Sequence, residues 1–339
     1  MKLGTSLRFV FPTSSATLGM YQNAVASLPP GSFIERPMGP FDTAGQARHL
    51  DEVARAAADA GAWAILVGDN HNVHPGYAAC FQPIPTIGRL SSSAGAARVG
   101  AVLLAPFYHP VLLAEQIATV AAFSEQPTLW AFAVGDRKPL FESFGLRTSD
   151  RGPLTEAVVS TVRALLDGET VTRTERSWTI VSATISPRPR HRPELLIGGS
   201  ALPAITRAAR LADGWLTAQN ATDTLLASQI RHYRDACDAA GRPPQVVLRR
   251  DIHVAATDRE AIDHIGPILA EGYRGVTFDE LLVGSPPTII DKLRTYHQGG
   301  IDRVLVRHVS GDHDAILASF DLIGRYVIPE ISTWPDKEP

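Results

Sequence analysis

The feature that most constrains this chain is an alternation of short apolar runs with amphipathic stretches, repeated eight times along 339 residues. The runs are rich in aliphatic and β-branched residues, which is typical of buried strands. We predict strands at residues 3–10, 64–67, 99–104, 129–134, 195–197, 215–217, 246–255 and 304–306. We predict helices at residues 44–60, 111–123, 154–166, 203–212, 225–239, 259–270 and 287–297.

Eight strand–helix units with nearly continuous apolar strands favour an α/β fold, a single (β/α)8 TIM barrel whose parallel strands are buried on both faces. The competing fold is a doubly wound open sheet. However, no GxGxxG follows the first strand, and no GxxxxGK[ST] occurs in the chain. We therefore expect one barrel domain over residues 1–331, with its site at the C-terminal ends of the strands. The polar residues 332–339 are expected to form a flexible tail.

The composition fits an enzyme that acts on small molecules. The chain is 45% hydrophobic and 20% charged, with a net charge of −3, so it has no basic excess for nucleic acid. Only four of its 32 basic residues are lysines, and none lies in an apolar strand beyond Lys2, which disfavours Schiff-base chemistry. Two cysteines cannot form a disulfide framework, and no apolar run indicates a signal or a membrane span. We expect a cytoplasmic protein.

Gly198, Gly199 and Ser200 form the most informative motif, because they end an apolar run and open an amphipathic helix. Glycines let a ligand approach the backbone, and free N–H groups at a helix N-terminus favour an anion. Ser200 can donate its hydroxyl to a phosphate or can cap the helix. The motif alone leaves both interpretations open.

Insertions interrupt the alternation after the first, fourth and seventh strands. Residues 12–41 mix Ser, Gly and Pro with large apolar side chains, and we expect a lid or binding loop, with a merely decorative excursion as the alternative. Residues 170–193 carry a tryptophan and a Pro-rich stretch, and they predict a hairpin followed by an extended segment.

Several segments together resemble the bacterial luciferase-like monooxygenase superfamily over nearly the whole chain. The order and spacing of these segments carry the resemblance more than any one of them. They are AGAWAILVGDNH (60–71), RVGAVLLAPFYHPV (98–111), FESFG (141–145) with RG (151–152), GGS (198–200) with ADGW (212–215), and VGSP (283–286) with GIDR (300–303).

The resemblance implies a TIM barrel that binds reduced FMN or the deazaflavin F420. It places the cofactor phosphate on Gly199 and Ser200, although many TIM barrels hold phosphate after strands seven and eight. It also implies a small-residue bulge in the third strand, often with a non-proline cis peptide, at Ala101 and Val102. An ordinary buried strand is the alternative there. Gly135 and Gly198 complete the cofactor-binding residues that we carry over.

The end of the second strand departs from the family pattern. Relatives have an acidic residue followed by a histidine that handles protons, whereas this chain has Asp69-Asn70-His71. Asn70 cannot titrate, and His71 would point away if the strand simply continued. Either His71, supported by Asp69, has taken over proton transfer, or the chemistry runs without a general base here. Asp69, His71 and His74 could also suggest a metal, but later strands offer too few ligands, and we expect none.

Several cationic and aromatic residues keep two interpretations each. Arg8, near the end of strand one, could face the site or form a surface salt bridge. His109 is expected to serve packing at a helix start. Arg303 and Arg307 flank the last strand, and one of them could hold a substrate anion, with a solvated role as the alternative.

Three functions remain open at this level. Reduced FMN could react with O₂ to oxidise a small organic substrate, or F420 could transfer a hydride in a reductase or dehydrogenase. A non-catalytic flavin-binding barrel is the third hypothesis, because Asn70 replaces the usual histidine. The resemblance further implies a homodimer and a flavin or F420 reductase as a partner, with no role for nucleic acid or membrane.

Overall fold

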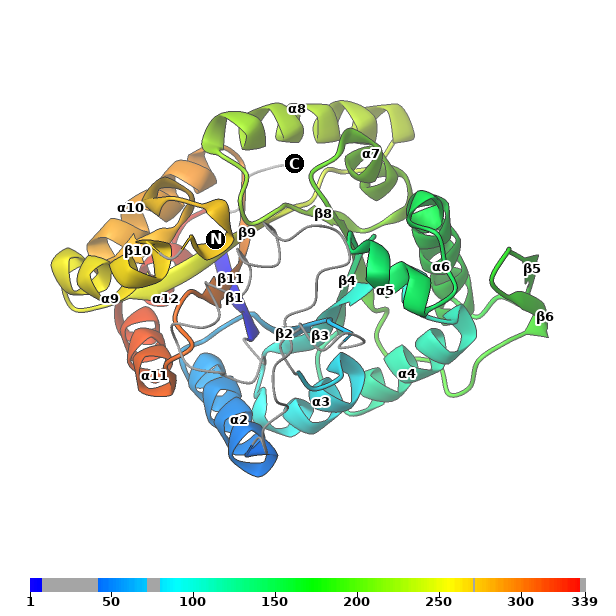
Figure 1. Cartoon of the computed structure of the whole chain (residues 1–339), viewed down its shortest axis with the longest axis horizontal. Coiled ribbons are helices and arrows are strands. Elements are labelled where there is room, and N and C mark those ends of the chain that lie inside the picture. Colours follow the sequence, from blue (N-terminus) through cyan, green and yellow to red (C-terminus); the bar gives the residue numbers. More distant parts are fainter. Residues whose placement is uncertain (8–41, 72–79, 271, 336–339) are drawn as a thin grey trace.

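In a computed structural model, the chain is described at residues 1–7, 42–71, 80–270 and 272–335. Eight parallel strands in this part close into a barrel, with helices around it as an outer ring (Figure 1). In barrel order they are β1 (Lys2–Leu7), β2 (Ala64–Gly68), β3 (Arg98–Leu104), β4 (Leu129–Ala133), β7 (Glu194–Gly198), β8 (Gly214–Leu216), β9 (Val246–Val254) and β11 (Arg303–His308). The ring closes because β11 pairs with β1, Lys2 lying opposite Arg303.

The predicted TIM barrel and all eight predicted strands are confirmed, mostly to within one or two residues at each end. The first strand is described as far as Leu7, and the rest of its predicted range lies outside the described residues. The helices of the described part are α2 (Thr43–Asp59), α3 (Pro83–Leu90), α4 (Pro110–Ala122), α5 (Lys138–Ser143), α6 (Arg151–Leu166), α7 (Leu202–Leu211), α8 (Asp223–Ala240), α9 (Asp258–Ala270), α10 (Pro286–Gln298), α11 (His313–Leu322) and α12 (Ile328–Ser332). A π-helical turn, Ile323–Val327, joins the last two.

The predictions missed several short elements, among them α3 and α5. Both helices carry a proline in their first turn, where the missing N–H costs no hydrogen bond, so proline marks their beginnings and does not break them. The end of the chain also folds further than predicted, into α11 and α12. No helix in the described residues is long and apolar enough to span a membrane.

The insertions after strands four and seven are confirmed. The first contains the antiparallel hairpin of β5 (Val171–Thr174) and β6 (Thr179–Ala183), which projects beyond α6 (Figure 1). The second contains two 3-10 turns, Tyr273–Gly275 and Phe278–Glu280, and a short strand, β10 (Leu282–Gly284), that extends the sheet along the end of β9. The insertion after strand one, residues 12–41, lies outside the described residues, as do Arg8 and His74.

The barrel has an apolar interior because alternate residues of each strand point inward. Small and aliphatic side chains fill this interior: Ala64, Leu66, Val102, Leu129, Ala131, Leu196, Leu216, Val247 and Leu305. Trp63 packs against this cluster, and its indole lies 3.4 Å from the carbonyl of Val304. The intervening residues face the helices and form the larger outer core.

The N-terminal end of the barrel carries a paired charge cluster. Glu194 accepts hydrogen bonds from Arg98 (2.6 Å) and from Arg303 (2.5 Å). Arg303 also donates to Gln245 at 3.2 Å, and its guanidinium lies over the Trp63 ring. Arg303 was expected either to hold a substrate anion or to be solvated, and neither interpretation holds. Its partners belong to several strands, and they lie at the end of the barrel opposite the C-terminal ends of the strands, which we call the mouth. Arg303 is a structural residue.

Candidate active site

Asp69 organises the C-terminal end of β2. Its side chain is buried, and one carboxylate oxygen accepts hydrogen bonds from the Leu104 amide (2.9 Å) and the Tyr108 hydroxyl (3.0 Å). Burial raises the pKa of this carboxyl, although His71 and the two donors act in the opposite direction. Asp69 thus ties the end of β2 to the end of β3 and holds a carboxyl in a desolvated position.

His71 does return to the same place as Asp69, against the simple expectation from strand alternation. Its Nε2 lies 3.5 Å from the second oxygen of Asp69. The imidazole packs among the rings of Phe107, Tyr108 and Phe144, with ring centroids 5.1 to 6.1 Å away. His71 is therefore half-enclosed by aromatic groups from the loops that follow β3 and β4, with a carboxyl behind it.

Asn70 has a different neighbour. Its side-chain oxygen accepts a hydrogen bond from Arg137 at 2.5 Å, and its backbone carbonyl accepts from the Cys80 thiol at 3.1 Å. Arg137 follows β4 and precedes α5, so the asparagine connects two loops of the mouth. A neutral amide suits this contact, since its oxygen is a permanent acceptor for a guanidinium.

The Gly198–Ser200 motif joins β7 to α7 as predicted, but its groups are used differently. The Gly199 amide donates to the Leu216 carbonyl (3.3 Å), so it is not free for a phosphate. Ala201 is the N-cap residue of α7, so the capping role for Ser200 is wrong. Ser200 is exposed, and its hydroxyl has no hydrogen-bond partner within the described part of the chain. The N–H donors available at this helix start are those of Ser200, Ala201 and Leu202.

Two side chains fix the backbone of this turn. The Trp215 indole donates to the Gly199 carbonyl at 2.8 Å, and Gln229 donates to the Ser200 carbonyl at 2.7 Å. Gly199 has φ = +147°, and a Cβ there would lie 3.0 Å from Ala204. The glycine is therefore required by the turn itself as well as by any ligand. Both carbonyls are held by protein donors, which leaves the amides to face an anion.

The predicted bulge at Ala101 and Val102 is absent. β3 pairs with β2 and β4 in unbroken register through both residues, and no cis peptide bond of the described residues falls between them. The Val102 side chain lies in the barrel interior, whereas Ala101 packs in the outer core. The ordinary strand, the alternative interpretation, is correct. Gly135 follows β4 at φ = +71°, beside Phe107 and Phe141.

The mouth also contains a group of charges that the sequence analysis found only in part. Arg307 of β11 donates to the Tyr273 hydroxyl (2.8 Å) and to Asp251 of β9 (3.1 Å). The Tyr273 hydroxyl donates to the same Asp251 oxygen at 2.7 Å, and the Arg274 Nε lies 3.7 Å from it. Arg249 lies two residues before Asp251 on the same strand face. We call these five residues the arginine cluster.

Regular pairing places this cluster beside the glycine motif. Gly198 pairs with Leu216, Leu216 pairs with Val247, and the Arg249 amide donates to the Thr217 hydroxyl at 3.0 Å. The start of α7 after β7 and the cluster on β9 therefore lie at the same end of the barrel, with β8 between them. The signal that could have found it is the run of three charged residues, Arg249 to Asp251, inside the otherwise largely apolar strand β9.

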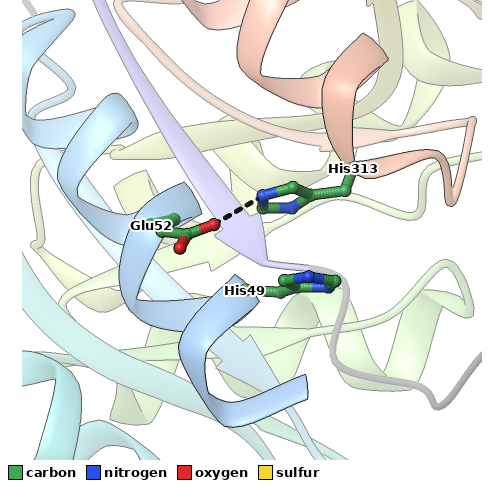
Figure 2. Close-up of side chains that lie close together, drawn as sticks. All are labelled: His49, Glu52 and His313. Carbon is green, nitrogen blue, oxygen red and sulfur yellow. Dashed lines mark hydrogen bonds and ion pairs between the residues drawn. The ribbon is translucent and has the colours of Figure 1, made fainter. Parts of the chain in front are cut away.

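The one group in the described residues with metal-ligand spacing lies elsewhere. His49 and Glu52 of α2 face His313 of α11 (Figure 2). The His313 Nε2 lies 2.7 Å from a Glu52 oxygen, and the two imidazoles stack with centroids 4.1 Å apart. These contacts join α2 to α11 on the outside of the barrel. The hypothetical group at the mouth included His74, which lies outside the described residues.

Comparisons with known proteins agree with this architecture. The family model described as luciferase-like monooxygenase matches residues 30–303, and the chain belongs to this family. An F420-dependent glucose-6-phosphate dehydrogenase of Nakamurella multipartita is 32% identical over 171 residues, which are 47% of this chain and 48% of that protein. The match to an uncharacterized protein of Mycobacterium bovis spans 59% of that protein, at 26% identity. The chain thus matches only about half of the length of its curated relatives.

Solved structures share the fold over most of this chain. The monooxygenase RslO1 from Streptomyces bottropensis superposes with a TM-score of 0.78, at 18% identity, over 97% of this chain and 99% of that one. The oxygenating constituent of 3,6-diketocamphane monooxygenase from Pseudomonas putida, solved with FMN, has a TM-score of 0.71, at 16% identity, over 87% of this chain and 96% of that one. Solved structures with this barrel thus include a monooxygenase constituent in complex with FMN and an F420-dependent secondary alcohol dehydrogenase.

Proposed function

We propose that the protein is an oxidoreductase that uses reduced FMN and O₂ to oxidise a small organic substrate at the C-terminal mouth of its barrel. The observation that carries this proposal is the pair of Asp69 and His71, partly enclosed by aromatic rings at the same end of the barrel as the start of α7. The resemblance to FMN-dependent monooxygenases supplies the cofactor, which the named residues must then accommodate.

The residues at the start of α7, which follows the fifth barrel strand β7, fit a phosphate. The amides of Ser200, Ala201 and Leu202 lie at a helix N-terminus, where the helix dipole favours an anion. The exposed Ser200 hydroxyl adds a further donor. Gly198 lies next to Leu216 at the end of β7 and presents bare backbone there.

The residues at the second strand fit proton handling. An imidazole titrates near neutral pH, and the carboxyl behind it favours one tautomer and stabilises the protonated ring. The aromatic rings around His71 exclude water, which strengthens electrostatic interactions at this position. When bound, the reduced flavin would supply the electrons that activate O₂, while His71 would move a proton at Nε2 or Nδ1.

Hydride transfer with F420 is the second candidate function. It is favoured by the curated relatives named as F420-dependent dehydrogenases and by the Asp69–His71 pair, since oxidation of an alcohol requires a base. A non-catalytic barrel is disfavoured by the same pair, because a flavin carrier needs no buried carboxyl behind a histidine. The predicted reductase partner belongs with the FMN reaction, which needs a source of reduced flavin.

Cofactor titration tests the proposal. Wild-type protein is titrated with FMN and with F420, each in oxidised and reduced form, followed by fluorescence and absorbance. We expect saturable binding, followed by O₂ consumption when the reduced FMN complex meets oxygen. Binding of F420 alone would move the assignment to hydride transfer, and binding of neither would overturn it.

A charge substitution tests the position of the phosphate. Ser200→Asp puts a carboxylate where the phosphate would lie and should weaken cofactor binding about 10-fold or more. The matched control is Thr222→Asp, which adds the same charge at the N-cap of the neighbouring helix α8, where aspartate is a good capping residue. Equal affinity in both variants would contradict the phosphate position.

The lid hypothesis for residues 12–41 concerns a segment outside the described residues and stays a prediction. Shortening this segment should change the substrate KM or the turnover more than the affinity for the cofactor. Homodimer formation is likewise a prediction, which sedimentation of the purified protein would test.

A further inference from the structure

The arginine cluster has more positive charge than its own carboxylate can neutralise. Arg249, Arg274 and Arg307 face the single carboxylate of Asp251. The Nε atoms of all three arginines are buried and have no hydrogen-bond partner in the part of the chain that the structure describes. The three side chains are half-buried, and a guanidinium partly removed from water is normally paired, because leaving a charge without a partner there is costly. Among the described residues the three cations share one carboxylate, whose Oδ1 is likewise buried without a hydrogen bond, so two positive charges remain without a countercharge.

Arg249 shows the deficit most clearly. Its guanidinium makes no hydrogen bond with any described residue, and burial together with the charges of Arg307 and Arg274 lowers its pKa to about 10. Its neighbour Arg250 points to the other side of the strand, where its Nε donates to the Tyr296 hydroxyl at 3.1 Å and its Nη2 lies 3.3 Å from Asp223. Among the described residues, the outer arginine, Arg250, has hydrogen-bond partners for its side chain, and the inner one, Arg249, has none.

Arg274 reaches the cluster through a strained backbone. It has φ = +51°, in the left-handed region that residues other than glycine rarely adopt. Glycines on either side, Gly272 and Gly275, also have positive φ. Such conformations persist where the surroundings impose them, and they concentrate at binding sites. The strained turn therefore places a third cation beside two others at a cost in free energy. A ligand that carries a negative charge would offset this cost.

We infer that the arginine cluster binds a carboxylate or phosphate group of the substrate. This inference rests on the proposed function for the place of the reaction and adds the class of substrate, a small organic anion. Two sources of such a group are possible, the substrate and the cofactor. The α7 start already offers donors for the cofactor phosphate, which leaves the cluster for the substrate. TIM barrels frequently bind phosphate after strands seven and eight, which are β9 and β11 in this fold.

The first experiment measures anion binding to the apoprotein by calorimetry and thermal shift, with inorganic phosphate and acetate as probes. Each titration is repeated in the Ser200→Asp background, where the α7 start is closed to phosphate. We expect binding in both backgrounds. Arg249→Met should weaken it about 10-fold or more, the effect of one charge-assisted contact. A second variant, Arg274→Met, should weaken it similarly while leaving the Arg307–Asp251 pair intact.

Stability provides a readout that a structural role would not give. Because Arg249 is a half-buried cation beside two other cations, Arg249→Met removes their mutual repulsion and should raise the melting temperature of the apoprotein by about 2 °C or more. The matched control is Arg98→Met at the opposite end of the barrel, which removes a paired arginine and should lower the melting temperature without changing anion binding. Unchanged phosphate and acetate affinity in Arg249→Met, or a lower melting temperature for it, would overturn the inference.

Cofactor affinity separates the two sources of the anion. FMN and F420 should bind Arg249→Met as tightly as wild type. If that variant loses cofactor binding as strongly as Ser200→Asp does, the cluster holds the cofactor and the substrate assignment is overturned. If wild type binds neither cofactor but still binds phosphate through Arg249, the proposed function fails while the anion site stands.

Discussion

The two ends of this barrel use the same residue type in opposite ways. At the N-terminal end, Arg98 and Arg303 share the carboxylate of Glu194, and each oxygen of that carboxylate has its own donor. At the C-terminal end, three arginines surround Asp251, and their buried Nε atoms have no acceptor among the residues that the structure describes. Arg303 and Arg307 belong to the same strand, four residues apart. The comparison indicates that the charges at the N-terminal end are balanced by the fold itself, whereas those at the C-terminal end exceed the countercharge that the described residues provide, as expected of a site for an anionic ligand.

The largest expected effect is the loss of Asp251. Burial alone would raise the pKa of this carboxyl, but Arg307, Arg274 and the Tyr273 hydroxyl outweigh burial and hold the pKa below its ordinary value. Asp251 itself is buried, and Asp251→Asn leaves three half-buried arginines without a countercharge, so it should lower the free energy of unfolding by about 3–5 kcal/mol. Urea denaturation measures this. Adding Arg249→Met should recover part of the loss, and strict additivity of the two changes would contradict a shared cluster.

The same carboxyl predicts a dependence on pH. Because the folded pKa of Asp251 lies below the unfolded value of about 3.9, its contribution is fully present above that value and is lost as pH falls through the folded pKa. Wild-type protein should therefore lose stability below about pH 4. A smaller slope is expected for Asp251→Asn over the same range, and identical slopes would show that the lowered pKa is not realised.

The next effect concerns turnover at the mouth. His71→Gln keeps a hydrogen-bonding side chain of similar size but removes the titrating group. We expect turnover to fall by roughly 10²-fold, with the acid limb of the pH profile lost and the melting temperature little changed. Steady-state kinetics over a pH series provides the measurement. Wild-type turnover and an unaltered profile would make His71 a packing residue and would leave the mouth without a general base on this strand.

A smaller effect is expected at the N-terminal end of the barrel. Glu194→Gln keeps the shape of the side chain but leaves Arg98 and Arg303 without a countercharge, and both are only partly buried. We expect a loss of about 1–3 kcal/mol in unfolding free energy, with cofactor affinity and turnover unchanged. Loss of activity in a folded Glu194→Gln protein would contradict the view that the N-terminal end of the barrel is structural and only the C-terminal end is functional.

The smallest effect should come from the outside of the barrel. His313→Ala removes the contacts to Glu52 and His49, which are partly exposed, so the expected loss is about 0.2–1 kcal/mol. Chemical denaturation with added zinc provides a further check. A rise in stability with zinc in wild type that disappears in the variant would show that this trio binds metal and is not merely a helix–helix contact.

The sequence predicted the barrel well because its strands are buried on both faces, which produces apolar runs that few other elements share. The start of α7 was also predictable from a local pattern, because an apolar run ends at Gly198–Ser200 and an amphipathic stretch begins there. The sequence did not show that the Gly199 amide is used by Leu216 or that Ala201 is the cap, since both depend on the exact turn. The bulge at Ala101 and Val102 came from the resemblance alone, and it is absent.

The arginine cluster was largely missed for a physical reason. Arg249 and Arg250 are adjacent and identical in type, and in a strand covered on both sides neither polarity nor period tells which one faces the interior. Asp251 and Arg274 come from separate segments that meet only after the barrel closes. The sequence indicated that either Arg303 or Arg307 could bind an anion, and it did not distinguish between them. The structure does, because Arg303 is paired with Glu194.

The most direct test of the functional end is a crystal structure of the wild-type protein with bound FMN or F420. The account predicts the cofactor phosphate on the amides of Ser200, Ala201 and Leu202, with the ring beside Val102 and His71 and the arginine cluster still open to a second ligand. A cofactor phosphate held by Arg249 and Arg307, or a ring bound away from the C-terminal ends of the strands, would contradict it.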